Sequence, residues 1–105
     1  MILRPELNGG RKMKTYDKAT WHIDGGEKPE EVIRKFEHVY EFLNCHDMLT
    51  EDGKEILDAG IDGSIVLTSN DLTPAGKRFI EDYYDSLINL TAEELEKKLN
   101  SIVVL

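Results

Sequence analysis

Apolar residues recur with a helical period between Pro29 and Leu57, and this stretch organises the rest of the chain. The apolar positions lie three and four residues apart, so an α-helix would carry them on one side: Val32, Ile33, Phe36, Val39, Tyr40 and Leu43. The charged positions between them are assigned to solvent: Glu30, Glu31, Arg34, Lys35, Glu37 and Glu41. Pro29 suits the first helical turn, where its missing N–H costs no hydrogen bond.

Three Leu-Thr pairs predict further helix starts. Thr50, Thr73 and Thr91 can each accept a hydrogen bond from a free N–H of a first helical turn. Thr91 with Glu94 makes a capping box, and Leu90 with Leu95 a hydrophobic staple. Residues 49–56 and 72–79 share the pattern Leu-Thr-x-x-Gly-Lys, which we interpret as two copies of one helix-start device. Helices are therefore expected over about 50–61, 74–88 and 92–100. The expected inward set of the second is Phe79, Ile80, Tyr83, Tyr84, Leu87 and Ile88.

Two short segments have strand character. Trp21 and Ile23 alternate with polar neighbours over residues 20–24, and residues 64–68 are rich in β-branched side chains. The two segments are expected to pair, with Trp21 anchoring the rim of the core. The predicted fold is a helix-rich α+β domain of three or four helices with a minor two-stranded β element. An all-α fold is the alternative.

The ends of the chain are treated separately. Residues 1–12 are expected to form a flexible tail, because Asn8-Gly9-Gly10 is a break, and residues 13–105 to form a single globular domain. The alternative is that Ile2, Leu3 and Leu7 form a short edge element. The apolar end, residues 102–105, is expected to dock on the core, with homodimer formation through it as the alternative.

The charge balance is strongly acidic. The formal net charge is −8, and the first fourteen residues hold four basic residues and one acidic residue, so the remainder carries −11. Such a surface repels nucleic acid and anionic lipid and attracts basic proteins. Simple solubility is the competing explanation. Cys45 is the single cysteine, no apolar run is long enough for a membrane helix, and no signal-peptide pattern begins the chain. A cytoplasmic protein without a cofactor is expected.

Candidate chemistry is sparse. His38, Glu41 and Cys45 share a helical face, and His22 could approach them, so metal binding through His22, His38 and Cys45 is retained as an alternative. Too few ligands have zinc-site spacing for a metal to be the first choice. Nothing marks an oxyanion site for catalysis by Cys45, and no phosphate-binding loop is present. A non-enzymatic protein is therefore favoured. A second small site is considered at Trp21, His22 and Asp24.

Two resemblances bear on function. The segment Ile65-Val66-Leu67-Thr68, followed by Leu72-Thr73-Pro74-Ala75-Gly76-Lys77, resembles the wing-to-helix junction of winged-helix regulators. The candidate recognition helix, residues 50–61, has only Lys54 among its acidic residues, so DNA binding is not expected. Residues 13–88, especially Thr20-Trp21-His22-Ile23-Asp24-Gly25-Gly26, are similar to small uncharacterised acidic bacterial and phage proteins. This resemblance implies a bacterial or phage cytoplasmic setting.

The favoured interpretation is a small acidic binding protein, of inhibitor or immunity type, that engages a basic protein partner. A negative surface steers the encounter with a positive cleft, and a central aromatic residue supplies the desolvated contact. The candidate partner-binding residues are Glu37, Glu41, Asp82, Asp85, Tyr83 and Tyr84, with Tyr83 or Tyr84 as an exposed anchor. A winged-helix-like regulatory module that acts through protein contacts is an alternative, favoured if a β-hairpin wing follows residue 63.

Overall fold

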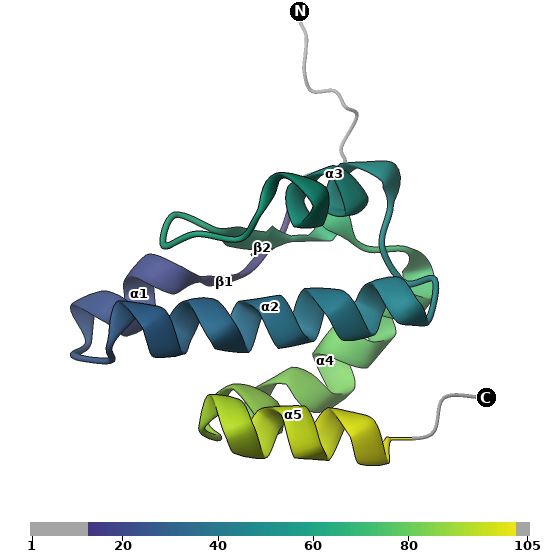
Figure 1. Cartoon of the computed structure of the whole chain (residues 1–105). Helices are drawn as coiled ribbons and strands as arrows, with labels where there is room; N and C mark the ends of the chain where they lie inside the picture. Colours follow the sequence, from purple (N-terminus) through teal and green to yellow (C-terminus); the bar gives the residue numbers. More distant parts are fainter. Residues whose placement is uncertain (1–12, 103–105) are drawn as a thin grey trace, which may run out of the picture.

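The computed structural model describes residues 13–102, which form a helix-rich α+β domain (Figure 1). The elements follow in the order β1 (Thr15–Lys18), α1 (Ala19–Asp24), α2 (Pro29–Cys45), α3 (Glu51–Ala59), β2 (Val66–Thr68), the 3₁₀ helix η2 (Ser69–Asp71), α4 (Pro74–Ile88) and α5 (Ala92–Ser101). The predicted class, with a minor two-stranded sheet, is confirmed. The expectations for residues 1–12 and 103–105 lie outside the described residues.

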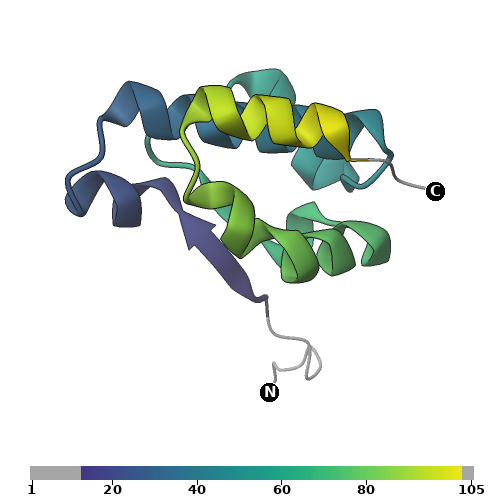
Figure 2. The same cartoon turned by 90° about the horizontal axis from the view of Figure 1, so that it is seen from below.

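Helix α2 is the centre of the core. It crosses the middle of the molecule, with α3 and the sheet on one side and α5 on the other (Figures 1 and 2). Val32, Phe36 and Val39 are fully buried along it, as the helical period predicts. Lys35, which the pattern assigned to solvent, is only 5% exposed. It is buried because its ammonium group has partners inside the protein, described below.

The two strands pair antiparallel, with Asp17 opposite Leu67 and Lys18 opposite Val66. The prediction that the partner strand spans residues 20–24 is wrong: the strand ends at Lys18, and Ala19–Asp24 is helical. Ala19 and Ile23 are a helical turn apart, and Ala19 is fully buried while Ile23 packs against the core. Over five residues a two-residue alternation does not separate a strand from one helical turn.

The repeated Leu-Thr segments are two helix starts that lie against each other. Leu49 and Leu72 form an antiparallel bridge, in which the Thr50 N–H donates to the Asp71 carbonyl (2.9 Å) and the Thr73 N–H to the Met48 carbonyl (3.0 Å). Each threonine caps its helix, because its hydroxyl accepts from the N–H of a glycine three residues on. The predicted caps at the start of α3 and α4 are therefore confirmed, and the two copies contact each other.

The glycines of this repeat are required by close approach. A Cβ on Gly53 would lie 2.5 Å from the Asp71 carbonyl oxygen, and one on Gly76 would collide with the Met48 carbonyl. Each helix start thus passes over the carbonyl that the other segment presents, and only a residue without a side chain fits there.

The start of α5 matches its prediction too. Thr91 and Glu94 form a capping box, in which each side chain accepts from the other residue's backbone N–H (3.1 Å in both directions). Pro74 stands at the first position of α4, as expected. Within residues 13–102, β2 pairs with β1, from which α1, α2 and α3 separate it, and no second strand follows residue 63 to pair with it, so the hairpin wing that would favour a winged-helix module is not formed there.

Candidate functional site

Most acidic side chains of residues 13–102 stand on the surface without a basic partner in that range. Among the described residues, only Asp17, Glu27 and Glu51 lie within salt-bridge distance of a lysine or histidine. The Lys54–Glu51 pair is loose, at 3.9 Å, and solvent-exposed. Exposed pairs of this kind contribute little to stability. The negative charge of the domain is therefore not neutralised by internal pairing within residues 13–102.

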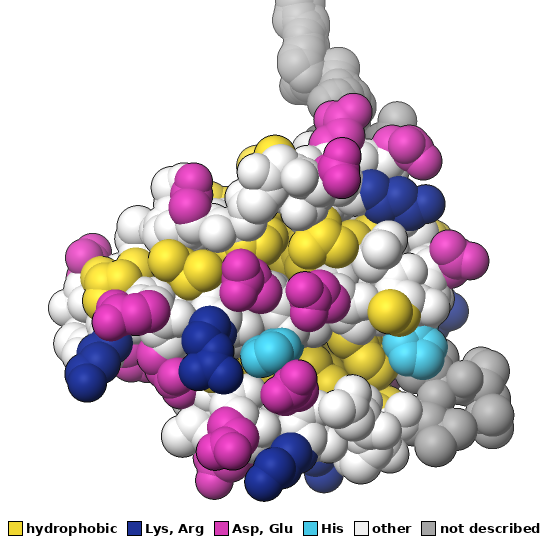
Figure 3. Space-filling model, viewed as in Figure 1, with side chains coloured by type: hydrophobic (Ala, Val, Ile, Leu, Met, Phe, Trp, Pro, Cys, Tyr) yellow, Lys and Arg dark blue, Asp and Glu magenta, His cyan; other side chains and the backbone are white. Residues whose placement is uncertain are grey.

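One acidic surface spans α2 and α3, and we call it the α2–α3 face. A groove of about 360 Å³ is lined by Asn44 of α2 and, from α3, by Glu51, Lys54, Glu55, Leu57 and Asp58. Glu37 and Glu41 precede Asn44 by seven and three residues, so all three project from one side of α2. Figure 3 shows carboxylates over both helices, with apolar side chains between them. The α2–α3 face therefore combines a negative rim with an apolar floor, to which Leu57 is the one apolar residue that the groove contributes.

A second groove lies where α2 meets α5, and we call it the α2–α5 groove. Its volume is about 410 Å³. One wall is lined by His38, Glu41, Phe42 and Cys45 of α2 and by His46, which caps that helix, and the other wall by Glu96, Leu99 and Asn100 of α5. Two imidazoles with apolar side chains between them are visible there in Figure 3. Nε2 of His38 is buried and has no hydrogen-bond partner among the described residues. Glu41 is common to this groove and the α2–α3 face.

An aromatic row runs from this groove to the surface of α4. The rings of His46 and Phe42 are 4.4 Å apart between centroids, Phe42 stacks on Phe79 at 4.8 Å, and Phe79 lies 5.2 Å from Tyr83. Tyr83 ends the row and is 46% exposed, although the sequence pattern assigned it to the core. The row links the packing of α2 to that of α4 and leaves Tyr83 accessible.

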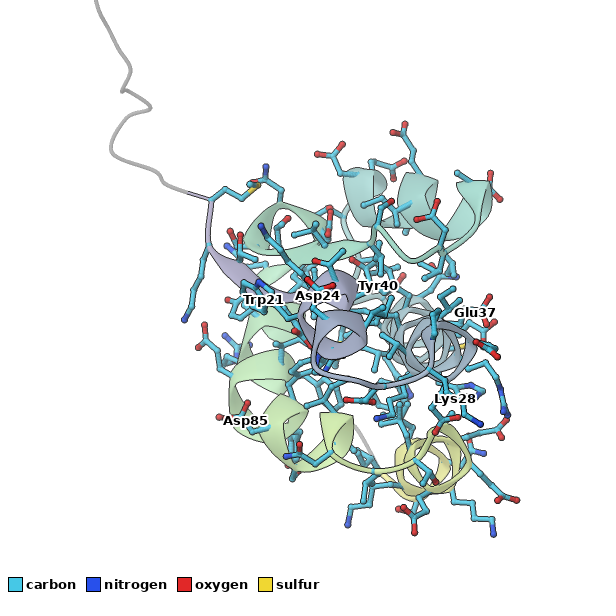
Figure 4. All side chains as sticks on the ribbon, turned by 90° about the vertical axis from the view of Figure 1, so that its left-hand side faces the viewer. Trp21, Asp24, Lys28, Glu37, Tyr40 and Asp85 are labelled. Carbon is cyan, nitrogen blue, oxygen red and sulfur yellow. The ribbon has the colours of Figure 1, made fainter. Side chains whose placement is uncertain are left out.

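The predicted partner-binding residues do not form one surface. Figure 4 shows Glu37 and Asp85 projecting from opposite sides of the molecule. Asp82 and Asp85 are exposed on α4, whereas Glu37 and Glu41 are on α2 with the α2–α3 face. One binding surface can include the α2 pair or the α4 pair, but not both.

Tyr84 is not an exposed anchor. Its side chain is 5% exposed, and its hydroxyl donates a 2.5 Å hydrogen bond to the buried carboxylate of Asp17 in β1. Burial, and then the charge of Asp17, raises the pKa of the Tyr84 hydroxyl well above its ordinary value. Of the two tyrosines proposed as anchor, only Tyr83 is accessible.

The predicted small site at Trp21, His22 and Asp24 is not a shared pocket. Trp21 is 54% exposed and does not anchor the core rim; the Lys18 ammonium lies 5.7 Å from the centre of its ring. Asp24 is exposed at the end of α1, as Figure 4 shows. His22 points instead between two carboxylates: its Nε2 is 2.6 Å from Asp17 and its Nδ1 is 3.2 Å from Glu27.

His22 belongs to a partly buried polar chain that the sequence pattern did not reveal. Tyr84 donates to Asp17, Asp17 faces His22, His22 faces Glu27, and Glu27 accepts from Lys35 Nζ (2.9 Å). Lys35 also donates to the Ile88 carbonyl (3.1 Å). The hydrogen bond from Lys35 lowers the pKa of Glu27, against the effect of partial burial. This chain joins β1, α1, α2 and α4, and its groups satisfy one another, so it serves to hold the fold together.

A second buried contact is similar. The Tyr40 hydroxyl donates to Asp71 (2.9 Å), whose same oxygen accepts from the Thr68 N–H (3.2 Å). Burial, and then Asp71, raises the pKa of Tyr40 far above its ordinary value. Asp71 thereby fixes the turn between β2 and α4 to α2.

The structure does not bring together the ligands of the metal-binding alternative. His38 and Cys45 line the α2–α5 groove, but His22 lies elsewhere and both of its ring nitrogens face carboxylates. Within residues 13–102, no three His, Cys, Asp or Glu side chains are grouped so that they could hold a metal ion. Across the same residues, no helix has the length and hydrophobicity to cross a membrane.

Comparisons with known proteins add no family. No protein family matches the chain, and searches of curated proteins and of solved structures return no significant match. The resemblances noted in the sequence therefore remain predictions. The function must be inferred from the charges and grooves on the surface of the protein.

Proposed function

We propose that this chain is a small acidic cytoplasmic binding protein that engages a basic protein partner through the α2–α3 face. The observation that carries the proposal is the arrangement on that face. Glu51, Glu55 and Asp58 line a groove whose one basic lining residue is Lys54. Glu37 and Glu41 project from the same side of α2 as Asn44, which also lines that groove. Such a field accelerates the encounter with a positively charged surface.

The apolar floor supports binding beyond simple solubility. Leu57 lines the groove between carboxylates and is half-buried, so a partner can desolvate it on docking. Stable interfaces place apolar contacts at the centre and polar groups at the rim. An inhibitor or immunity-type protein, which covers the positive cleft of a nucleic-acid enzyme, has this design.

The test compares two sets of neutralised variants. The face variant carries Glu37→Gln, Glu55→Gln and Asp58→Asn, and the control carries Asp82→Asn, Asp85→Asn and Glu93→Gln, so both lose three negative charges. Each is immobilised beside the wild type, and binding of a panel of purified basic nucleases and nucleic-acid-binding proteins is measured at low salt and at about 0.5 M salt.

We expect a basic protein to bind the wild type and the control, and to be lost from the face variant and at high salt. Equal binding by both variants would show that net charge, not this face, governs the interaction. The absence of any basic partner from the panel and from lysates of the source organism would overturn the proposal.

A further inference from the structure

We propose that the α2–α5 groove is the anchor site for an arginine side chain of the partner. This inference rests on the proposed function, because it names the chemical group that the basic partner presents. The groove lies next to the α2–α3 face, and Glu41 belongs to both. A partner seated on that face therefore reaches the groove without leaving the acidic surface.

The charge of the groove selects a cation. Glu41 and Glu96 line it from the two helices, and among the described residues that line it there is no lysine or arginine. Both carboxylates are exposed and have no salt-bridge partner within residues 13–102. A guanidinium group between them would gain charge-assisted hydrogen bonds from two helices at once.

The walls of the groove suit the rest of an arginine side chain. His46 presents an exposed aromatic ring that packs on the buried ring of Phe42, and Leu99 adds an aliphatic surface opposite them. A guanidinium plane stacks on aromatic rings, and its methylene stem packs on apolar groups. The volume of about 410 Å³ is that of an ordinary ligand pocket, for which roughly 300–1,000 Å³ is typical. A lysine ammonium would pair with one carboxylate but would not stack.

The unpaired nitrogen of His38 is a second feature of the groove wall that an occupant can satisfy. Nε2 is buried at the wall of the groove and lacks a hydrogen-bond partner among the described residues. A buried polar atom without a hydrogen-bond partner is destabilising. In the tautomer that carries its proton on Nδ1, Nε2 is an acceptor, and a guanidinium N–H of an occupant is a donor that suits it. The ring of His38 is therefore a reporter of occupancy.

The experiment titrates the ¹⁵N-labelled full chain with a capped arginine and, separately, with capped citrulline, its uncharged isostere. We expect arginine to shift the amide signals of residues 38–46 and 96–102 and the ring signals of His38, and citrulline to shift none of them. Glu41→Gln and Glu96→Gln should each weaken arginine binding about tenfold, since each removes a charge-assisted hydrogen bond. The matched control Glu93→Gln, on α5 but outside the groove, should bind as the wild type does.

Shifts of equal size with citrulline, shifts outside the groove, or unchanged affinity in Glu41→Gln and Glu96→Gln would overturn the anchor. These outcomes for the arginine site can be distinguished from failure of the proposed function. If a basic partner still binds through Glu37, Glu55 and Asp58, the function stands and the anchor falls. If arginine occupies the groove while no basic protein binds the chain, the anchor stands and the proposed function falls.

Discussion

The hydroxyl of Tyr84 donates a 2.5 Å hydrogen bond to the carboxylate of Asp17, which connects α4 to β1 across 67 residues of chain. Asp17 is 5% exposed, and it also accepts from its neighbour's backbone, the Lys18 N–H. Because the carboxylate is buried, its charge is stabilised by these donors and by His22 and not by water.

Tyr84→Phe should therefore destabilise the fold by about 1–2 kcal/mol, since it removes one donor from a buried carboxylate without changing the packing of the ring. Asp17→Ala should cost more, because it leaves both Tyr84 and His22 without their partner. Urea unfolding of the two single variants and the double variant measures the coupling. If the double variant lost as much unfolding free energy as the two single variants added together, Tyr84 and Asp17 would not stabilise the fold through their mutual hydrogen bond.

Three tyrosines should resist ionisation in the folded protein. Burial and neighbouring carboxylates raise the pKa of Tyr40 and Tyr84 well above 10.0, and burial with Glu81 raises that of Tyr16 to about 12. The unfolded chain releases these protons near pH 10, so the folded state binds more protons above that value and stability must fall as pH rises.

The measurement is tyrosinate absorbance against pH, with circular dichroism followed in parallel. As pH rises, the tyrosinate absorbance of Tyr40 and Tyr84 should appear at the same pH at which circular dichroism shows loss of helix, and not at a lower pH. Tyr40→Phe and Tyr84→Phe should each reduce the steepness of the alkaline loss of stability. Full ionisation of all four tyrosines with the helices intact would contradict this assignment.

The Glu27–Lys35 pair should govern part of the acid response. Lys35 lowers the pKa of Glu27 below its ordinary 4.5. A lowered pKa in the folded state contributes stability that is present above pH 4.5 and is lost as pH falls through the lowered value. Glu27→Gln should reduce the dependence of unfolding free energy on pH in this range. Glu30→Gln, exposed at the start of α2, is the matched control and should leave the pH dependence as it is in the wild type.

Alanine at the two helix-start glycines should destabilise the fold. Glycine to alanine within a helix is usually stabilising by up to about 1 kcal/mol. At Gly53 and Gly76 the added Cβ would meet the carbonyl oxygens of Asp71 and Met48, so the sign reverses. We expect losses of about 1–3 kcal/mol in urea unfolding. Gly63→Ala, whose Cβ would meet only Ile23 at an ordinary 3.6 Å, is the control and should be near neutral.

Local signals in the sequence predicted α2, α3, α4 and α5 but not α1. The threonine cap and Pro74 fixed the start of α4, and its predicted range, 74–88, agrees with the structure. The strand at residues 20–24 was wrong because the alternation of Trp21 and Ile23 spans too few residues to exclude a helical turn. The strand that does form, Thr15–Lys18, has little apolar pattern of its own.

Long-range relationships could not be predicted. The chain of contacts from Tyr84 to Lys35 joins residues far apart, and nothing local marks Lys35 as a buried cation. The sequence identifies the acidic residues but not the side of the molecule on which each one lies. Glu37 and Asp85 are therefore predicted to share one binding surface, although they project in opposite directions. The sequence revealed one wall of the α2–α5 groove, because spacing placed His38, Glu41 and Cys45 on one helical face. It did not reveal the other wall, because Glu96 lies on another helix, 51 residues after Cys45.

The mutual contact of the Leu49–Thr50 and Leu72–Thr73 segments makes α3 and α4 a cooperative unit. Neither helix can begin correctly unless the carbonyl and N–H of the other segment are already in place. Partial opening that frees one start also frees the other, so their amide protons should exchange with solvent at a common rate. A partner that docks on α3 would thereby slow exchange at the start of α4, on a helix that it does not touch.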